Sequence, residues 1–286
     1  MLRQVQHDKT MLHFICNDAM IKFTEFRNIK VRYSDKGKGR TIVLLHGFLE
    51  SLEVFEELSD QFSKTFRVIS IDLPGHGQNS SIGYVHSMEL MAECAKSVLD
   101  SLGIRKYVVV GHSMGGYVAL AFAELFPQNV SGLCLFHSTA MPDSEEKKKD
   151  RDRVAEIVMK DHSQFVSNLI PKLFAKENIT LLKNEVSKAK SIALNTPKEG
   201  IVAALQGMKE RPSRELVLKN AKCPVLFIIG KQDVILAWEN LLLLAGLPKK
   251  TFHLVLEHAG HMGFYESPEE TFKALKKFAG MCFRTK

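Results

Sequence analysis

The chain has 286 residues, 45% hydrophobic and 25% charged, which is typical of a globular protein with a sizeable core. Its net charge of +7 is spread along the sequence and forms no basic stripe interleaved with aromatic residues, so nucleic acid is not expected as a partner. No apolar run approaches the ~20 residues of a membrane span, so a membrane is not expected as a partner either.

Five cysteines are present, an odd number, and they show no spacing typical of a metal site: Cys16, Cys94, Cys134, Cys223 and Cys282. This pattern favours a reducing compartment, and we expect a cytoplasmic protein. Neither a metal ion nor an organic cofactor is expected.

In chain order, the first half alternates between strand-like and helical segments. The patterns predict strands at residues 21–26, 28–33, 41–45, 66–71 and 107–110, and helices at residues 52–62, 88–102 and 117–126. A further strand is expected at residues 130–136. Such alternation predicts a mostly parallel sheet with helices on both faces.

The alternation breaks after His137. Residues 141–212 contain no convincing strand and are punctuated by prolines, with helical segments around 150–160, 163–174, 178–191 and 198–208. Strands resume at 224–229 and 252–256, and a helix over 268–278 ends the pattern. We therefore expect a core formed by residues 20–140 and 213–286, a helical insertion at 141–212 and an N-terminal extension at 1–19.

One motif organises the chain. The pentapeptide Gly111-His112-Ser113-Met114-Gly115 follows an apolar strand and precedes a helix, which is the context of a nucleophile elbow. The sharp turn exposes the serine hydroxyl, and the close approach of the flanking chains requires the glycines. The helix that starts at the serine directs its free N–H groups towards developing negative charge.

A serine hydroxyl becomes a good nucleophile when a base removes its proton and an acid orients that base. Asp233 and His261 follow the last two predicted strands, so both are expected at the same sheet edge as Ser113. The order Ser, Asp, His is the one expected on this scaffold. His258 is an alternative base and Asp143 an alternative acid, although spacing and flanking glycines favour His261 and Asp233.

An oxyanion requires two fixed donors, and the backbone N–H groups of Met114 and Phe48 are the candidates. Phe48 follows the strand at residues 41–45, where Gly47 allows close approach of the backbone. Candidates for the substrate pocket are His137, Met141, Phe165, Phe174 and Met262. Packing into the core is the alternative role for these side chains.

These motifs together resemble the α/β-hydrolase superfamily over residues 21–282. The matching pieces are His46-Gly47-Phe48, Asp72-Leu73-Pro74-Gly75-His76-Gly77, Gly111-His112-Ser113-Met114-Gly115-Gly116, Gly230-Lys231-Gln232-Asp233 and Gly260-His261-Met262. The resemblance implies a sheet of about eight strands, the first ones antiparallel, with residues 141–212 as a helical cap. Within the superfamily the chain is similar to small carboxylesterases and to the pimeloyl-carrier-protein methyl-ester esterase type.

The resemblance implies a serine hydrolase that cleaves carboxylic esters or thioesters of small to medium acyl groups. The serine differs from the aspartate nucleophile of haloalkane dehalogenases and epoxide hydrolases. Met262 stands where hydrolases of carbon–carbon bonds typically carry Trp. Lactonase, perhydrolase and carbon–carbon hydrolase activities use the same triad and stay open. A ligand receptor with slow turnover is the alternative to an enzyme.

Overall fold

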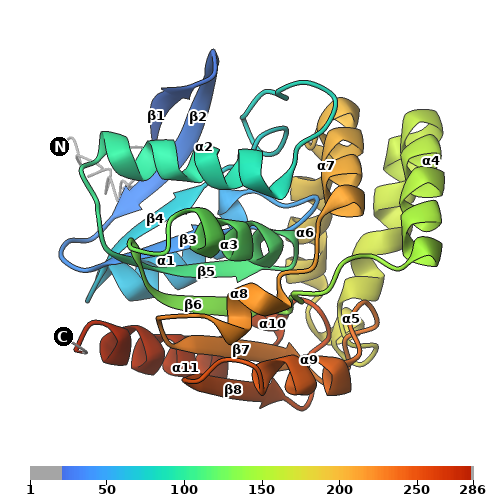
Figure 1. Ribbon diagram of the computed structural model, residues 1–286. Helices are drawn as coiled ribbons and strands as arrows, with labels where there is room; N and C mark the ends of the chain where they lie inside the picture. Colours follow the sequence, from blue (N-terminus) through green and yellow to red (C-terminus); the bar gives the residue numbers. More distant parts are fainter. Residues whose placement is uncertain (1–20, 285–286) are drawn as a thin grey trace, which may run out of the picture.

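The computed structural model describes residues 21–284, and its centre is one eight-stranded sheet (Figure 1). Its strands, in chain order, are β1 (Ile21–Phe26), β2 (Ile29–Lys36), β3 (Thr41–Leu45), β4 (Arg67–Ile71), β5 (Tyr107–His112), β6 (Val130–Phe136), β7 (Val225–Gly230) and β8 (Thr251–Leu256). The order across the sheet is β1-β2-β4-β3-β5-β6-β7-β8. Strand β2 is antiparallel to both of its neighbours, and the other pairs are parallel.

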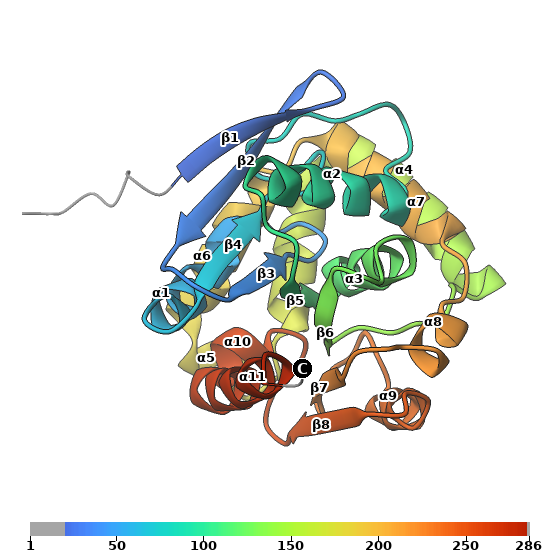
Figure 2. The same cartoon turned by 60° about the vertical axis from the view of Figure 1, so that its left-hand side comes forward.

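Helices cover both faces of this sheet, which buries its central strands on both sides. On one face lie α2 (Met88–Ser101) and α3 (Met114–Leu125), while α1 (Glu56–Ser63) and α11 (Pro268–Cys282) lie on the other (Figure 2). Strands β3, β5 and β7 are buried throughout. Burial on two faces explains their continuous apolar sequences, and the expected fold class is confirmed.

The chain between β6 and β7 contains only helices, which we call the helical insert (residues 145–219). These are α4 (Glu145–Leu169), η3 (Ile170–Leu173), α5 (Asn178–Leu181), α6 (Lys183–Leu194), α7 (Lys198–Glu210) and α8 (Glu215–Lys219). Helices α4 to α7 stand beyond the carboxyl ends of the parallel strands (Figure 1). Helix α4 is interrupted at Asp161, whose φ of −144° and ψ of 84° are not helical.

The structure differs from the sequence-based expectations mainly at element ends. Helix α4 begins at Glu145, before the helical segment expected around residues 150–160, because the Ser144 hydroxyl accepts a hydrogen bond from the Lys147 amide and caps the helix. The short 3₁₀ helix η2 (Leu52–Phe55) precedes α1, and α9 (Trp238–Ala245) and α10 (Gly263–Glu266) were not expected. The N-terminal extension expected at 1–19 lies outside the described residues. Within residues 21–284, no helix is both long enough and apolar enough to span a membrane.

Candidate active site

Ser113 lies at the turn between β5 and α3, in a conformation that few non-glycine residues adopt. Its φ is 50° and its ψ is −115°, a strain of roughly 1–3 kcal/mol that the surrounding packing must hold. A Cβ atom at Gly111 would collide with the carbonyl of Gly115, and one at Gly115 would collide with the carbonyl of Leu45. The Ser138 hydroxyl donates to the Ser113 carbonyl at 2.8 Å. The turn is therefore held from several sides, with the serine at the carboxyl edge of the sheet.

A continuous chain of hydrogen bonds connects Ser113, His261 and Asp233. Nε2 of His261 lies 2.8 Å from Oγ of Ser113, and Nδ1 lies 2.7 Å from Oδ2 of Asp233. Asp233 follows β7 and His261 follows β8, so three separate strand ends bring these groups together. In this arrangement Nδ1–H donates to the carboxylate, and Nε2 is left to accept the serine proton.

The carboxylate of Asp233 is almost completely buried and its charge is nevertheless favoured. Burial alone would raise the pKa of Asp233, but His261 and its hydrogen bond hold that pKa at about 2. The second oxygen accepts the amide hydrogens of Ile235 and Leu236, at 2.7 and 3.2 Å. These contacts fix the carboxylate plane, so the orientation of the His261 ring is fixed as well.

The two alternatives from the sequence lie elsewhere. Asp143 is paired with Arg151 and with Arg211, at 2.5 and 2.8 Å. The carbonyl of His258 accepts a hydrogen bond from the Asn178 side chain, and the structure shows no contact between the His258 ring and Ser113. The geometry thus places His261 beside the serine and Asp233 beside that histidine.

A cavity of about 230 Å³ opens on Ser113 and His261. Its other lining residues are Phe48, Glu50, Tyr117, Lys147, Asp150, Arg151, Val154, Phe165, Leu169, Leu173, Leu205, Met208 and Ile235. Most of this wall is apolar, and the helical insert contributes more than half of it. The cavity size suits a small or medium acyl group.

Of the five pocket candidates from the sequence, the structure places Phe165 in the cavity wall. The other four lie elsewhere. His137 is fully buried behind Asp233, where its Nδ1 accepts the Gly230 amide hydrogen at 3.0 Å. Phe174 is buried and stacks on Tyr265, Met262 is buried, and Met141 is 44% exposed. Apolar residues near a strand end or on a helix can face either the core or the pocket, and the sequence pattern did not separate these roles.

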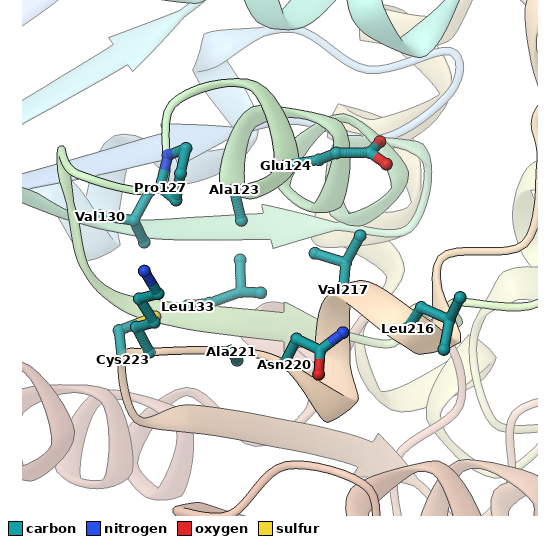
Figure 3. Close-up of a pocket in the computed structure, with 11 residues that line it drawn as sticks. Ala123, Glu124, Pro127, Val130, Leu133, Leu216, Val217, Asn220, Ala221 and Cys223 are labelled. Carbon is teal, nitrogen blue, oxygen red and sulfur yellow. The ribbon is translucent and has the colours of Figure 1, made fainter.

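A second hollow, of about 280 Å³, lies at the other end of the sheet (Figure 3). It is lined by the start of β6, the end of α3 and the segment from α8 to Cys223. Because it sits at the amino ends of β6 and β7, it is separate from the Ser113 edge. Its lining is mostly aliphatic and includes the Glu124 and Lys222 side chains.

Comparison with known proteins identifies the family. The model of the alpha/beta hydrolase fold matches residues 40–268. The chain belongs to the alpha/beta hydrolase family. It is similar to a 2-hydroxy-6-oxononadienedioate/2-hydroxy-6-oxononatrienedioate hydrolase of Paraburkholderia phymatum, with 32% identity over 88% of this chain and 91% of that protein. Among solved structures, a thermophilic esterase from Thermogutta terrifontis has a TM-score of 0.86 and 33% identity, covering 92% of this chain and 98% of the esterase. The enol-lactonase from Burkholderia xenovorans shares the fold, with a TM-score of 0.84 and 20% identity over 90% of this chain and 99% of the lactonase.

In this alpha/beta hydrolase, a buried ion pair lies beside Ser113 and His261. Nδ1 of His112 lies 3.0 Å from Glu50, and Nε2 donates to the carbonyl of His261 at 2.8 Å. Although burial opposes its charge, the Glu50 carboxylate raises the pKa of His112. Glu50 also accepts the Gly47 amide hydrogen at 2.6 Å. The pair therefore links the loop that follows β3, the nucleophile elbow and the His261 loop.

A second carboxylate holds the His261 loop against the helical insert. One oxygen of Glu266 accepts the amide hydrogens of Gly260 and Met262, at 2.9 and 3.1 Å. The other accepts from the Ala175 amide at 2.7 Å and from the Asn178 side chain at 2.8 Å. Glu266 thus joins the histidine loop to the segment between η3 and α5.

Sequence reasoning missed both carboxylates of this hydrolase. Glu50 lies four residues after His46, and Glu266 lies five residues after His261. Proximity to these recognised motifs was therefore the only sequence feature that pointed to a role for either carboxylate. Nothing in the local pattern distinguishes them from the many exposed acidic residues. Their burial becomes visible when distant segments are brought together.

Proposed function

We propose that the protein is a serine hydrolase that cleaves carboxylic esters of small to medium acyl groups through an acyl-enzyme. The observation that carries this proposal is the unbroken hydrogen-bonded chain from Asp233 through His261 to Ser113, at the mouth of a cavity. Family membership and the esterase from Thermogutta terrifontis support the same chemistry.

In the first half of the reaction, Oγ of Ser113 attacks the carbonyl carbon of the ester while Nε2 of His261 takes its proton. The negative charge that develops on the carbonyl oxygen is held by the backbone N–H groups of Phe48 and Met114. When the tetrahedral intermediate collapses, the carbon–oxygen bond to the alcohol breaks and His261 protonates the departing oxygen. The acyl group is then bonded to Ser113.

In the second half, water replaces the alcohol. His261 takes a proton from the water as its oxygen attacks the acyl carbon, and returns that proton to Oγ of Ser113 when the carboxylic acid leaves. Asp233 stays ionised throughout and stabilises the imidazolium that forms twice in each cycle. The helical insert acts as the cap, since its side chains complete the cavity into which the acyl chain extends.

The test is a stopped-flow experiment with p-nitrophenyl butyrate. We expect a burst of about one p-nitrophenol per chain if deacylation is the slower step, followed by steady turnover. Ser113→Ala should lower the rate roughly 10⁴- to 10⁶-fold while leaving the circular dichroism spectrum unchanged. Activity within tenfold of wild type would overturn the proposal. A burst with almost no subsequent turnover would favour the slow-turnover receptor instead.

A second candidate is cleavage of a carbon–carbon bond with the same triad. It is favoured by the 32% identity to the 2-hydroxy-6-oxononadienedioate hydrolase over 88% of this chain. Incubation with that dienedioate, followed by absorbance of the dienol chromophore, separates the two. Turnover of the dienedioate faster than that of every simple ester would replace the esterase proposal.

A further inference from the structure

The cavity above Ser113 has one charged stretch, and helix α4 supplies it. Lys147, Asp150, Arg151 and Val154 all line the cavity. Their spacing of three, four and seven residues places them on one face of the helix. Most of the remaining wall is apolar. A helix face that is merely solvated has no reason to border an apolar cavity with a lysine and an arginine, so these charges require an explanation.

The carboxylates nearby do not balance these cations. Asp143 accepts from Arg151 at 2.5 Å and pairs with Arg211 at 2.8 Å, so one carboxylate serves two guanidiniums. Asp150 pairs with the exposed Arg153 at 2.9 Å. The side chain of Lys147 has no hydrogen-bond or ion-pair partner among residues 21–284. A positive charge at the cavity is therefore left without a counterion.

Arg211 adds to this charge from behind the wall. Its guanidinium lies 4.0 Å from the centroid of the Tyr117 ring, and that ring lines the cavity. The residue is only 7% exposed, and its Nε atom has no hydrogen-bond partner. Because water is largely excluded here, its charge acts on the cavity with little screening. The Glu50 carboxylate, which also lines the cavity, is neutralised by His112.

From this arrangement we infer that the α4 end of the cavity binds a carboxylate at the far end of the acyl chain, so that the preferred substrates are monoesters of dicarboxylic acids. Arg151 and Arg211 share one carboxylate and Lys147 has none, so positive charge is in excess at this end of the cavity. Such an excess favours an anion, and Arg and Lys are the side chains that bind carboxylates best. The acyl chain carries the charge because it stays bonded to Ser113 until deacylation and must fit the cavity. This inference rests on the proposed esterase function and narrows its substrate class.

The test compares two methyl esters of equal chain length, monomethyl adipate and methyl hexanoate, which differ by a carboxylate in place of a terminal methyl group. We expect kcat/KM for the adipate monoester to exceed that for the hexanoate at least tenfold at low ionic strength, and the preference to shrink with added salt. Lys147→Gln should lower the preference about tenfold. Lys149→Gln, an exposed lysine on the same helix outside the cavity wall, is the matched control and should change neither rate.

Binding to the Ser113→Ala variant, measured by calorimetry, gives a readout that does not depend on turnover. Monomethyl adipate should bind at least tenfold more tightly than methyl hexanoate, and the additional Lys147→Gln change should remove that difference. Equal binding and equal kcat/KM of the two esters would overturn the inference while leaving the esterase proposal intact. If wild type cleaves neither ester nor any p-nitrophenyl ester, the esterase proposal fails, and the binding comparison still decides the carboxylate site.

Discussion

The imidazole of His112 donates a hydrogen bond to the backbone carbonyl of His261, with 2.8 Å between the two atoms, so one histidine holds the loop that carries the other. A carbonyl only accepts, so Nε2 of His112 must carry a proton. Its Nδ1 faces Glu50, and although burial opposes the charge of that carboxyl, His112 and the Gly47 amide lower its pKa. Because an ionised carboxylate only accepts, Nδ1 carries a second proton. His112 is therefore an imidazolium, buried beside the proposed base and balanced by Glu50.

We expect Glu50→Gln to destabilise the fold by about 3 kcal/mol, because it leaves a buried cation without its counterion. The double variant Glu50→Gln/His112→Asn should recover part of that loss, and urea unfolding at pH 7 measures both. If the losses of the two single variants simply add in the double variant, the two side chains do not form a pair.

The same pair predicts a dependence of stability on pH. The pKa of His112 is raised by Glu50 in the folded state, so the pair stabilises fully below the ordinary histidine pKa of about 6.5. That contribution is lost as pH rises through the raised folded value. Wild type should therefore lose more stability than His112→Asn above pH 6.5. Equal slopes of the unfolding free energy against pH in the two proteins would contradict a charged His112.

Glu266→Gln should disturb the His261 loop. A carboxamide keeps a single acceptor oxygen, and its NH₂ group faces two of the four N–H donors that the carboxylate binds. We expect a loss of about 2 kcal/mol in stability and a fall in kcat of up to about a hundredfold, with a smaller change in KM.

The matched control for this change is Glu269→Gln, three residues away, which removes an exposed pair with Lys273. Such a pair contributes little to stability. If both variants keep the wild-type kcat, Glu266 is a structural contact without influence on the position of His261.

The parts of this molecule that the sequence predicted are those with a local cause. Central strands are buried on both faces, so β5 and β7 appear as uninterrupted apolar runs. The elbow needs two glycines at fixed positions around Ser113, because any Cβ atom there would meet backbone. Local spacing therefore carried the mostly parallel sheet and the candidate triad residues, while the resemblance to the superfamily implied the number of strands.

The parts that the sequence did not predict have non-local causes. Glu266 acquires its role because residues 175 and 178 of the helical insert come to lie beside the loop at 260–262. The charged stretch of α4 looks like a solvated helix face until the fold turns part of it towards Ser113. His137 was a pocket candidate by its place at a strand end, but it points into the core behind Asp233.

Asp233→Asn should lower kcat for methyl hexanoate about 10⁴-fold, because an amide favours the wrong tautomer of His261. Asp143→Asn should cost at least a hundredfold less in kcat, since Asp143 contacts Arg151 and Arg211 and not the histidine. Steady-state kinetics of both variants, with folding checked by circular dichroism, decide between the two carboxylates. A larger loss in Asp143→Asn would show that the acid lies after β6.

Acid denaturation tests the charge state of Asp233 independently of catalysis. Its pKa is about 2 in the folded protein, below the ordinary value of 3.8. A carboxylate with a depressed folded pKa stabilises above the unfolded value, and the stabilisation is lost as pH falls through the folded value. The shift corresponds to about 2 kcal/mol of stability, which is lost between roughly pH 4 and pH 2.

Asp233→Asn cannot titrate, so its unfolding free energy should fall less steeply than that of wild type over this range. Asp100→Asn, at an exposed carboxylate, should follow the wild-type curve. Urea unfolding at half-unit steps of pH gives the slopes, and parallel curves for wild type and Asp233→Asn would mean that His261 does not hold this carboxylate in its charged form.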